Sequence, residues 1–134
     1  MNPISYLFIR LGIGVSMFGH GLVRLPKLTA FSDKMVSDFG DSMLPELLVR
    51  PFSLAIPFVE FLLGVCLLLG YKSTWTAVAG ATFMLCLMLG TAAIENWSAY
   101  PSQMIHLGFF VILLQFMAAN TLSLDDYLSN KPTH

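Results

Sequence analysis

The residues best able to do chemistry stand at the end of the first apolar segment, in the stretch FGHGLVRLPKL, residues 18–28. His20 and Arg24 are four positions apart, so a helix places them on one face, one turn from each other. Histidine exchanges protons near neutral pH, and a neighbouring arginine stabilises an anion. Together with Lys27, these residues also suit a helix that is simply leaving a membrane. The rest of the chain must decide between a site and a helix end.

Three later ionisable residues also stand in or beside apolar segments: Glu60, Glu95 and His106. A charged group at the centre of a bilayer costs about 2.5–3.5 kcal/mol on insertion scales, so such side chains usually face protein and pair. Glu60 is the deepest of the three, and Pro57, one turn earlier, removes a helical hydrogen bond and can bend the helix. We interpret Glu60 as a functional acid, with a structural ion pair to a cation of residues 18–28 as the alternative. For Glu95 and His106, a solvated helix end explains the charge equally well.

The composition predicts an integral membrane protein of one domain, residues 1–134. Hydrophobic residues make up 56% of the chain and charged residues only 11%, about half the share in an ordinary soluble domain. The net charge is -1, with no basic run, which argues against a nucleic-acid partner. Membrane lipid is therefore the one partner that composition predicts directly.

Four segments have the roughly 20 mostly apolar residues that a membrane-spanning helix requires. They are residues 4–25, 52–70, 74–95 and 103–120. The last three are joined by short connections, so consecutive helices should be antiparallel neighbours. We therefore predict an all-α, four-helix antiparallel membrane bundle with both termini on the same side.

The connection between the first two spans is too polar to cross a bilayer. In residues 28–50, apolar side chains recur at helical spacing at Leu28, Phe31, Met35 and Phe39. Polar residues, Ser32 among them, occupy the opposite face. This pattern predicts an amphipathic segment that lies on the membrane surface or folds over the end of the bundle.

The ionisable residues converge on the end of the bundle that carries this loop. At 1.5 Å per helical residue, His20 lies roughly 7 Å and Glu60 roughly 12 Å inside that end. We predict His20 and Glu60 as catalytic residues. We predict Arg24, Lys27, Glu95 and His106 as residues that bind a substrate or quinone, and Arg10 and Pro57 as structural residues.

Cys66 and Cys86 have neither metal-ligand nor redox spacing, and we interpret both as core residues.

Three stretches of the chain resemble motifs of the DoxX family of four-helix membrane proteins. RLGIGVSMFGHGLVRLPKL, residues 10–28, resembles its first-helix signature, and PFVEFLLGVCLLLGYKST, residues 57–74, resembles its second. SLDDYL, residues 123–128, is similar to a segment that follows the last helix in that family. The resemblance matches Arg10, His20 and Glu60 to family positions. It implies relatedness to the membrane subunit of a thiosulfate:quinone oxidoreductase.

These observations leave three functions open. The first is a quinone-linked redox unit in the bacterial inner membrane, where His20 or Glu60 exchanges protons with a quinone held by Arg24 or Lys27. Whether the chain is itself an enzyme stays open, since it shows no redox centre of its own. The second is a non-enzymatic assembly factor or accessory subunit, acting with a partner subunit or as a homo-oligomer. The third is a haem or metal protein using His20 and His106, which no local motif supports.

Overall fold

The computed structural model describes residues 1–130, and these residues are helical without any strand. The long helices are α1 (Pro3–Arg24), α3 (Glu46–Leu69), α4 (Ser73–Ala93) and α5 (Tyr100–Gln115). Shorter elements are η1 (Leu25–Lys27), α2 (Leu28–Asp38), η2 (Met117–Ala119) and α6 (Leu124–Ser129). The predicted all-α class is confirmed. Residues 131–134 of the predicted domain lie outside the described part.

Three helical stretches are long and apolar enough to cross a membrane: Pro3–Asp38, Glu46–Leu69 and Ser73–Ala93. The protein is therefore an integral membrane protein. The predicted fourth span is not confirmed, because α5 has 16 residues and ends at Gln115, where the chain passes into η2. The second span begins at Glu46 instead of residue 52, because the helix runs through Pro51 and Pro57.

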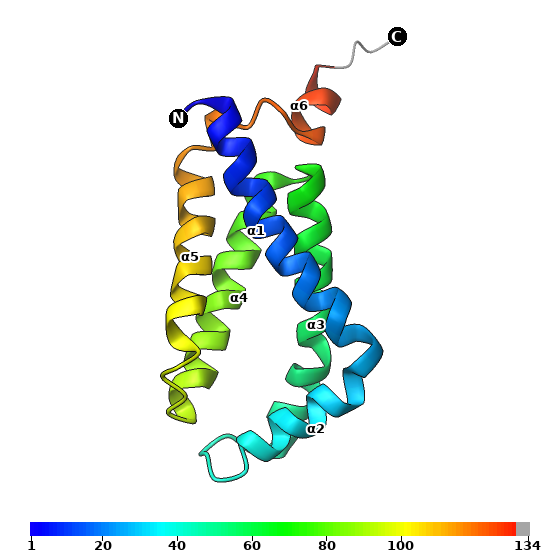
Figure 1. Ribbon diagram of the computed structural model, residues 1–134, viewed down its shortest axis with the longest axis vertical. Helices are drawn as coiled ribbons and strands as arrows, with labels where there is room; N and C mark the ends of the chain where they lie inside the picture. Colours follow the sequence, from blue (N-terminus) through cyan, green and yellow to red (C-terminus); the bar gives the residue numbers. More distant parts are fainter. Residues whose placement is uncertain (131–134) are drawn as a thin grey trace.

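The four long helices form two closely packed pairs, α1 with α3 and α4 with α5 (Figure 1). Glycines permit the first pair to approach closely, since a Cβ atom at Gly21 would meet the backbone of Phe61 and one at Gly64 would meet the backbone of Phe18. Contacts between the two pairs are fewer. In Figure 1 the pairs lie together near the α3–α4 turn and diverge toward the end where α2 lies.

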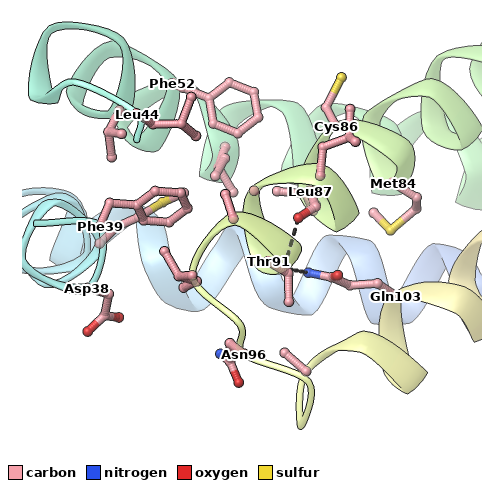
Figure 2. Close-up of a pocket in the computed structure, with 18 of the residues that line it drawn as sticks. Asp38, Phe39, Leu44, Phe52, Met84, Cys86, Leu87, Thr91, Asn96 and Gln103 are labelled. Atoms are coloured by element: carbon pink, nitrogen blue, oxygen red, sulfur yellow. Dashed lines mark hydrogen bonds between the residues drawn. The ribbon is translucent and has the colours of Figure 1, made fainter. Parts of the chain in front are cut away.

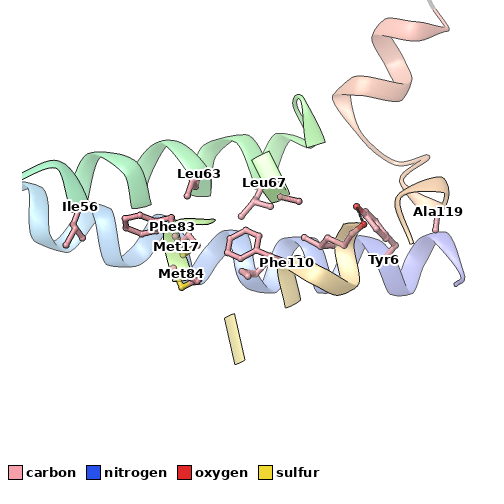
Figure 3. Packing of buried hydrophobic residues seen from close by; sticks show 12 residues of the cluster. Tyr6, Met17, Ile56, Leu63, Leu67, Phe83, Met84, Phe110 and Ala119 are labelled. Carbon is pink, nitrogen blue, oxygen red and sulfur yellow. Dashed lines mark hydrogen bonds between the residues drawn. The ribbon is translucent and has the colours of Figure 1, made fainter. Parts of the chain in front are cut away.

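The apolar core runs between the pairs and receives side chains from each long helix (Figure 3). Its largest fully buried side chains include Tyr6 and Met17 of α1 and Phe110 of α5. The Tyr6 hydroxyl donates to the Leu113 carbonyl at 3.2 Å, so this ring satisfies its polar atom within the core. The core thereby joins the two helix pairs over the half of the molecule where they lie together.

The predicted amphipathic segment is helical as α2, and it lies across the end where the two helix pairs diverge (Figure 1). Phe31 and Met35 pack against the core, and Phe39 is buried after the helix ends. Ser32, predicted on the polar face, is buried instead. Its hydroxyl forms a 2.7 Å hydrogen bond with that of Ser53 on α3, so two small polar groups satisfy each other where the helices meet.

At the opposite end, Arg10 fastens α1 to the segment after α5. Its side chain is buried, and Nη1 and Nη2 donate to Asn120 Oδ1 and to the Leu122 carbonyl, each at 2.8 Å. The Asp125 carboxylate accepts the backbone N–H groups of Lys72 and Ser73 at 2.7 Å, which ties the start of α6 to the α3–α4 turn. Burial on its own would raise the pKa of Asp125, but these hydrogen bonds outweigh it and hold the pKa below its ordinary value.

Candidate functional site

A cavity of about 1030 Å³ lies at the diverging end, lined by side chains of α1 to α5 and the loops beside them. Four of the predicted site residues line it: His20, Arg24, Glu60 and His106. Three helices contribute them, α1 the first two, α3 the third and α5 the last. Residues from three distant segments of the chain therefore line one cavity.

Arg24 and Glu60 form an ion pair in the wall of this cavity. Arg24 Nη1 lies 2.6 Å from Glu60 Oε1, and the guanidinium group also stacks 4.9 Å from the centre of the Phe31 ring of α2. The Glu60 side chain is 5% exposed, whereas that of Arg24 is 33% exposed. Glu60 Oε2 is buried and receives no hydrogen bond from the described residues. The carboxylate is thus only half satisfied by its partner.

The two histidines differ in how they are held. His106 Nδ1 lies 2.7 Å from the Ser102 carbonyl, which can only accept, so Nδ1 carries a proton. The Nε2 atom of His106 lies 2.8 Å from Ser16 Oγ, and this contact fixes the ring on both sides. The His20 ring is 6.4 Å from the His106 ring, is exposed to the cavity, and forms no hydrogen bond within residues 1–130. His20 is therefore the histidine available to a ligand.

A second polar pair in the cavity wall was missed at the sequence level. Gln103 Nε2 donates to Thr91 Oγ1 at 2.7 Å, and that hydroxyl donates to the Leu87 carbonyl at 2.8 Å (Figure 2). Gln103 Oε1 is buried and has no donor among the described residues. Its position three residues before His106 was the available signal, because that spacing puts both on one face of α5.

Four predicted residues do not line the cavity. Lys27 lies exposed in η1, and Glu95 follows the end of α4 with a left-handed backbone (φ 54°). The span predicted to reach residue 95 ends at Ala93, which leaves Glu95 on the exposed connection. Arg10 lies at the opposite end, and Pro57 is buried inside α3, one turn from Glu60. The structure therefore does not bring Lys27 or Glu95 to a shared binding site.

The structure also gives the positions of the two cysteines and of the side chains that could bind a metal. Cys66 is half-buried, but Cys86 is exposed and lines the cavity, so the prediction of a core residue was wrong for Cys86. The error arose because α4 is apolar on nearly all sides, which hides the cavity-facing side from sequence. Within residues 1–130, no group of three or more His, Cys, Asp or Glu side chains is arranged to hold a metal ion.

Residues 2–104 match the model of one protein family, described as methylamine utilisation protein MauE. No curated protein and no solved structure matches the chain. The matched range contains both long stretches that resembled DoxX, so the assignment to DoxX was wrong. Glycines spaced for helix packing and a lone acid in an apolar run serve many membrane bundles, which is why those motifs misled. The chain belongs to the MauE family and is an integral membrane protein built from apolar helices.

Proposed function

We propose that this protein is a membrane accessory protein of methylamine utilisation, and that it binds an amphiphilic small molecule in the cavity at the diverging end of its helices. The family description supports the biological setting. The cavity carries the second half of the proposal, because its volume of about 1030 Å³ is at the upper end of the range for small-molecule pockets. The accessory role implies a protein partner, either another subunit or a second copy of the chain.

The cavity wall carries both polar and apolar side chains, which is what an amphiphile requires. His20, Arg24 and Glu60 supply a hydrogen-bonding group, a fixed cation and a carboxylate. Phe52, Ile56 and Leu87 are among the apolar residues that line the remainder. We place the head group of the ligand against the polar residues and its tail against the apolar ones.

Some polar groups of the cavity wall also have no hydrogen-bond partner within the described residues. A buried acceptor left without a donor costs about 1–3 kcal/mol, so a purely structural ion pair is expected to engage both carboxylate oxygens. Glu60 Oε2 and Gln103 Oε1 are both without donors in the described chain, and His20 is free. These groups favour a ligand site over a structural cluster.

The proposed roles follow from how each group is held. His20 hydrogen-bonds to the head group and can exchange a proton with it, while Arg24 stabilises negative charge on it. Glu60 positions Arg24, and His106 forms the fixed wall beside His20. A quinone is one amphiphile with a head group of this kind, and it is the proposed cofactor that we would look for first.

We further propose that α5 and η2 together form a fourth span, which completes a four-helix bundle with both termini on one side of the bacterial inner membrane. The support is the close packing of α5 along α4, which is itself long enough to cross. Reporter fusions at the two ends of the chain test this arrangement. Four spans predict the same compartment for both reporters, and opposite compartments would overturn it.

The ligand proposal is tested by purifying the protein in mild detergent and extracting it with organic solvent for mass spectrometry. We expect one amphiphile in near-stoichiometric amount with the wild type, and its loss from His20→Ala and Glu60→Gln. Lys27→Gln is the matched control, because Lys27 is an exposed charge outside the cavity. Wild-type protein without such a molecule, or retention by both cavity variants, would contradict the proposal.

A further inference from the structure

We propose that the ligand reaches the cavity sideways from the bilayer, through an opening between α3 and α4. This inference rests on the proposed function and adds the route. It also narrows the ligand class to molecules that dissolve in the hydrocarbon layer. The edges of the opening are Leu48 and Phe52 on α3 and Cys86 and Leu89 on α4.

The course of the two helices creates the opening. The connection between α3 and α4 is short, and Gly70 ends α3 with a left-handed backbone (φ 66°) that lets the chain reverse. From this turn the helices run toward the loop end, and they pack against each other much less than α1 packs against α3 or α4 against α5. α1 and α5 also pack sparsely against each other, but the cavity residues they contribute include the polar His20, Ser102 and His106, so the apolar gap is the one between α3 and α4.

Residues at the edge face the cavity and the outside at once. Leu89 is 74% exposed, Leu48 61% and Phe52 37%, yet all three line the cavity. A side chain can do both only where the cavity reaches the molecular surface. In Figure 2, Phe52 and Cys86 project from neighbouring helices toward the same side of the cavity.

We place the edge of the opening within the hydrocarbon layer, on the inner side of the exposed Arg50 ion pairs with Asp33 and Glu46. Phe52 lies six residues after the start of α3 at Glu46, and Cys86 lies seven residues before the end of α4 at Ala93. At 1.5 Å per residue both are about 10 Å from the loop end of their helices, and both helices are candidate spans. An apolar edge at that depth meets acyl chains, so a lipid-soluble molecule can pass through it without crossing water.

The cavity also reaches the surface at the water-facing end, where the exposed Lys34, Asp38 and Met43 line it. That opening has charged edges, which suit a lipid-soluble molecule less well than the apolar edge between α3 and α4, and α2 lies across this end with Phe31 and Met35 toward the cavity. Arg24 stacks on Phe31, which holds α2 against the polar wall. A head group that enters between α3 and α4 would reach His20 and Arg24 on the far side, with its tail still in the opening.

The route is tested by the rate at which dansyl-undecanoic acid, a fluorescent amphiphile, binds to the protein in phosphatidylcholine vesicles. Cys86→Trp narrows the opening, and we expect binding to slow about tenfold or more, with a smaller change in Kd. Phe52→Ala widens it and should speed binding, a change of opposite sign that misfolding would not produce. Leu85→Trp is the matched control, since Leu85 is 51% exposed on the same helix but does not line the cavity.

Each outcome has a distinct meaning. Slower binding in Cys86→Trp and faster binding in Phe52→Ala, with Leu85→Trp unchanged, would support the sideways route. Unchanged rates in both edge variants would overturn it, as would slowing only in Ser102→Trp, which obstructs the cavity beside the start of α5. If the wild type binds no amphiphile in any assay, the proposed function itself fails.

Discussion

The polar groups at the two ends of this helical protein differ in how many of their hydrogen bonds are made within the protein. At the α6 end, Arg10 uses both terminal nitrogens on Asn120 and Leu122, and Asp125 caps the start of α4. The Nε atom of Arg10 is the one buried polar side-chain atom at this end that has no partner among the described residues, and the cavity does not reach it. At the α2 end, Glu60 Oε2 and Gln103 Oε1 receive no donor within residues 1–130, and His20 stands free beside a large cavity. Polar residues that satisfy one another hold a membrane protein together. Polar residues left partly unsatisfied around a cavity favour binding something else.

Arg10→Met should have the largest effect on stability and the smallest on ligand binding. The substitution leaves Asn120 Oδ1 and the Leu122 carbonyl without their donor, at about 1–3 kcal/mol for each buried group. Thermal unfolding in detergent measures the loss. Arg10→Lys is the control, because a lysine retains the charge but cannot reach two acceptors in the same geometry. An Arg10→Met protein that is as stable as wild type would show that the hydrogen bonds of Arg10 do not stabilise the α6 end.

The Arg24–Glu60 pair should couple by a smaller amount, about 1 kcal/mol, because Arg24 is one-third exposed and water screens it. A double-mutant cycle with Arg24→Gln and Glu60→Gln measures this coupling from unfolding midpoints. In each single variant, the free energy of ligand binding should change by more than the free energy of unfolding. A coupling of several kcal/mol, together with unchanged ligand binding in the single variants, would show that the polar residues at the α2 end are structural, as those at the α6 end are.

The smallest effect is expected from Asp125, through pH. Its folded pKa is depressed, so its hydrogen bonds contribute stability above the unfolded pKa of about 3.9, and this contribution is lost as pH falls through the folded value. Asp125→Asn should remove that acid-dependent part while changing stability at neutral pH by less than about 1 kcal/mol. Unfolding midpoints between about pH 2 and pH 6 would test it. An identical acid dependence in the variant would show that Asp125 does not titrate with folding.

Sequence predicted three of its four membrane spans and four residues of the cavity wall, because hydropathy and depth along a helix are both local properties. The first span was predicted at residues 4–25 and is observed at Pro3–Arg24, where Asn2 caps the helix. The start of α3 was misplaced because Pro51 looked like a boundary, although the helix continues through it. Helix breaks at proline are tendencies that tertiary packing overrides.

Other features depend on which face of a helix packs against the rest of the protein, and the identity of a single residue does not reveal that face. Ser32 was placed on the wrong side of α2, since its partner Ser53 lies 21 positions away. Cys86 was interpreted as core although it faces the cavity. The family was mistaken for a related reason: short motifs record helix packing, whereas the match to MauE extends over residues 2–104.

The central claim is that the α2 end is a ligand site and the α6 end is not. Native mass spectrometry of protein released directly from its own membranes tests this most directly. We predict one small-molecule adduct on wild type and on Arg10→Met, and its absence from His20→Ala and Glu60→Gln. An adduct that persists in both cavity variants, or is lost only from Arg10→Met, would contradict the claim.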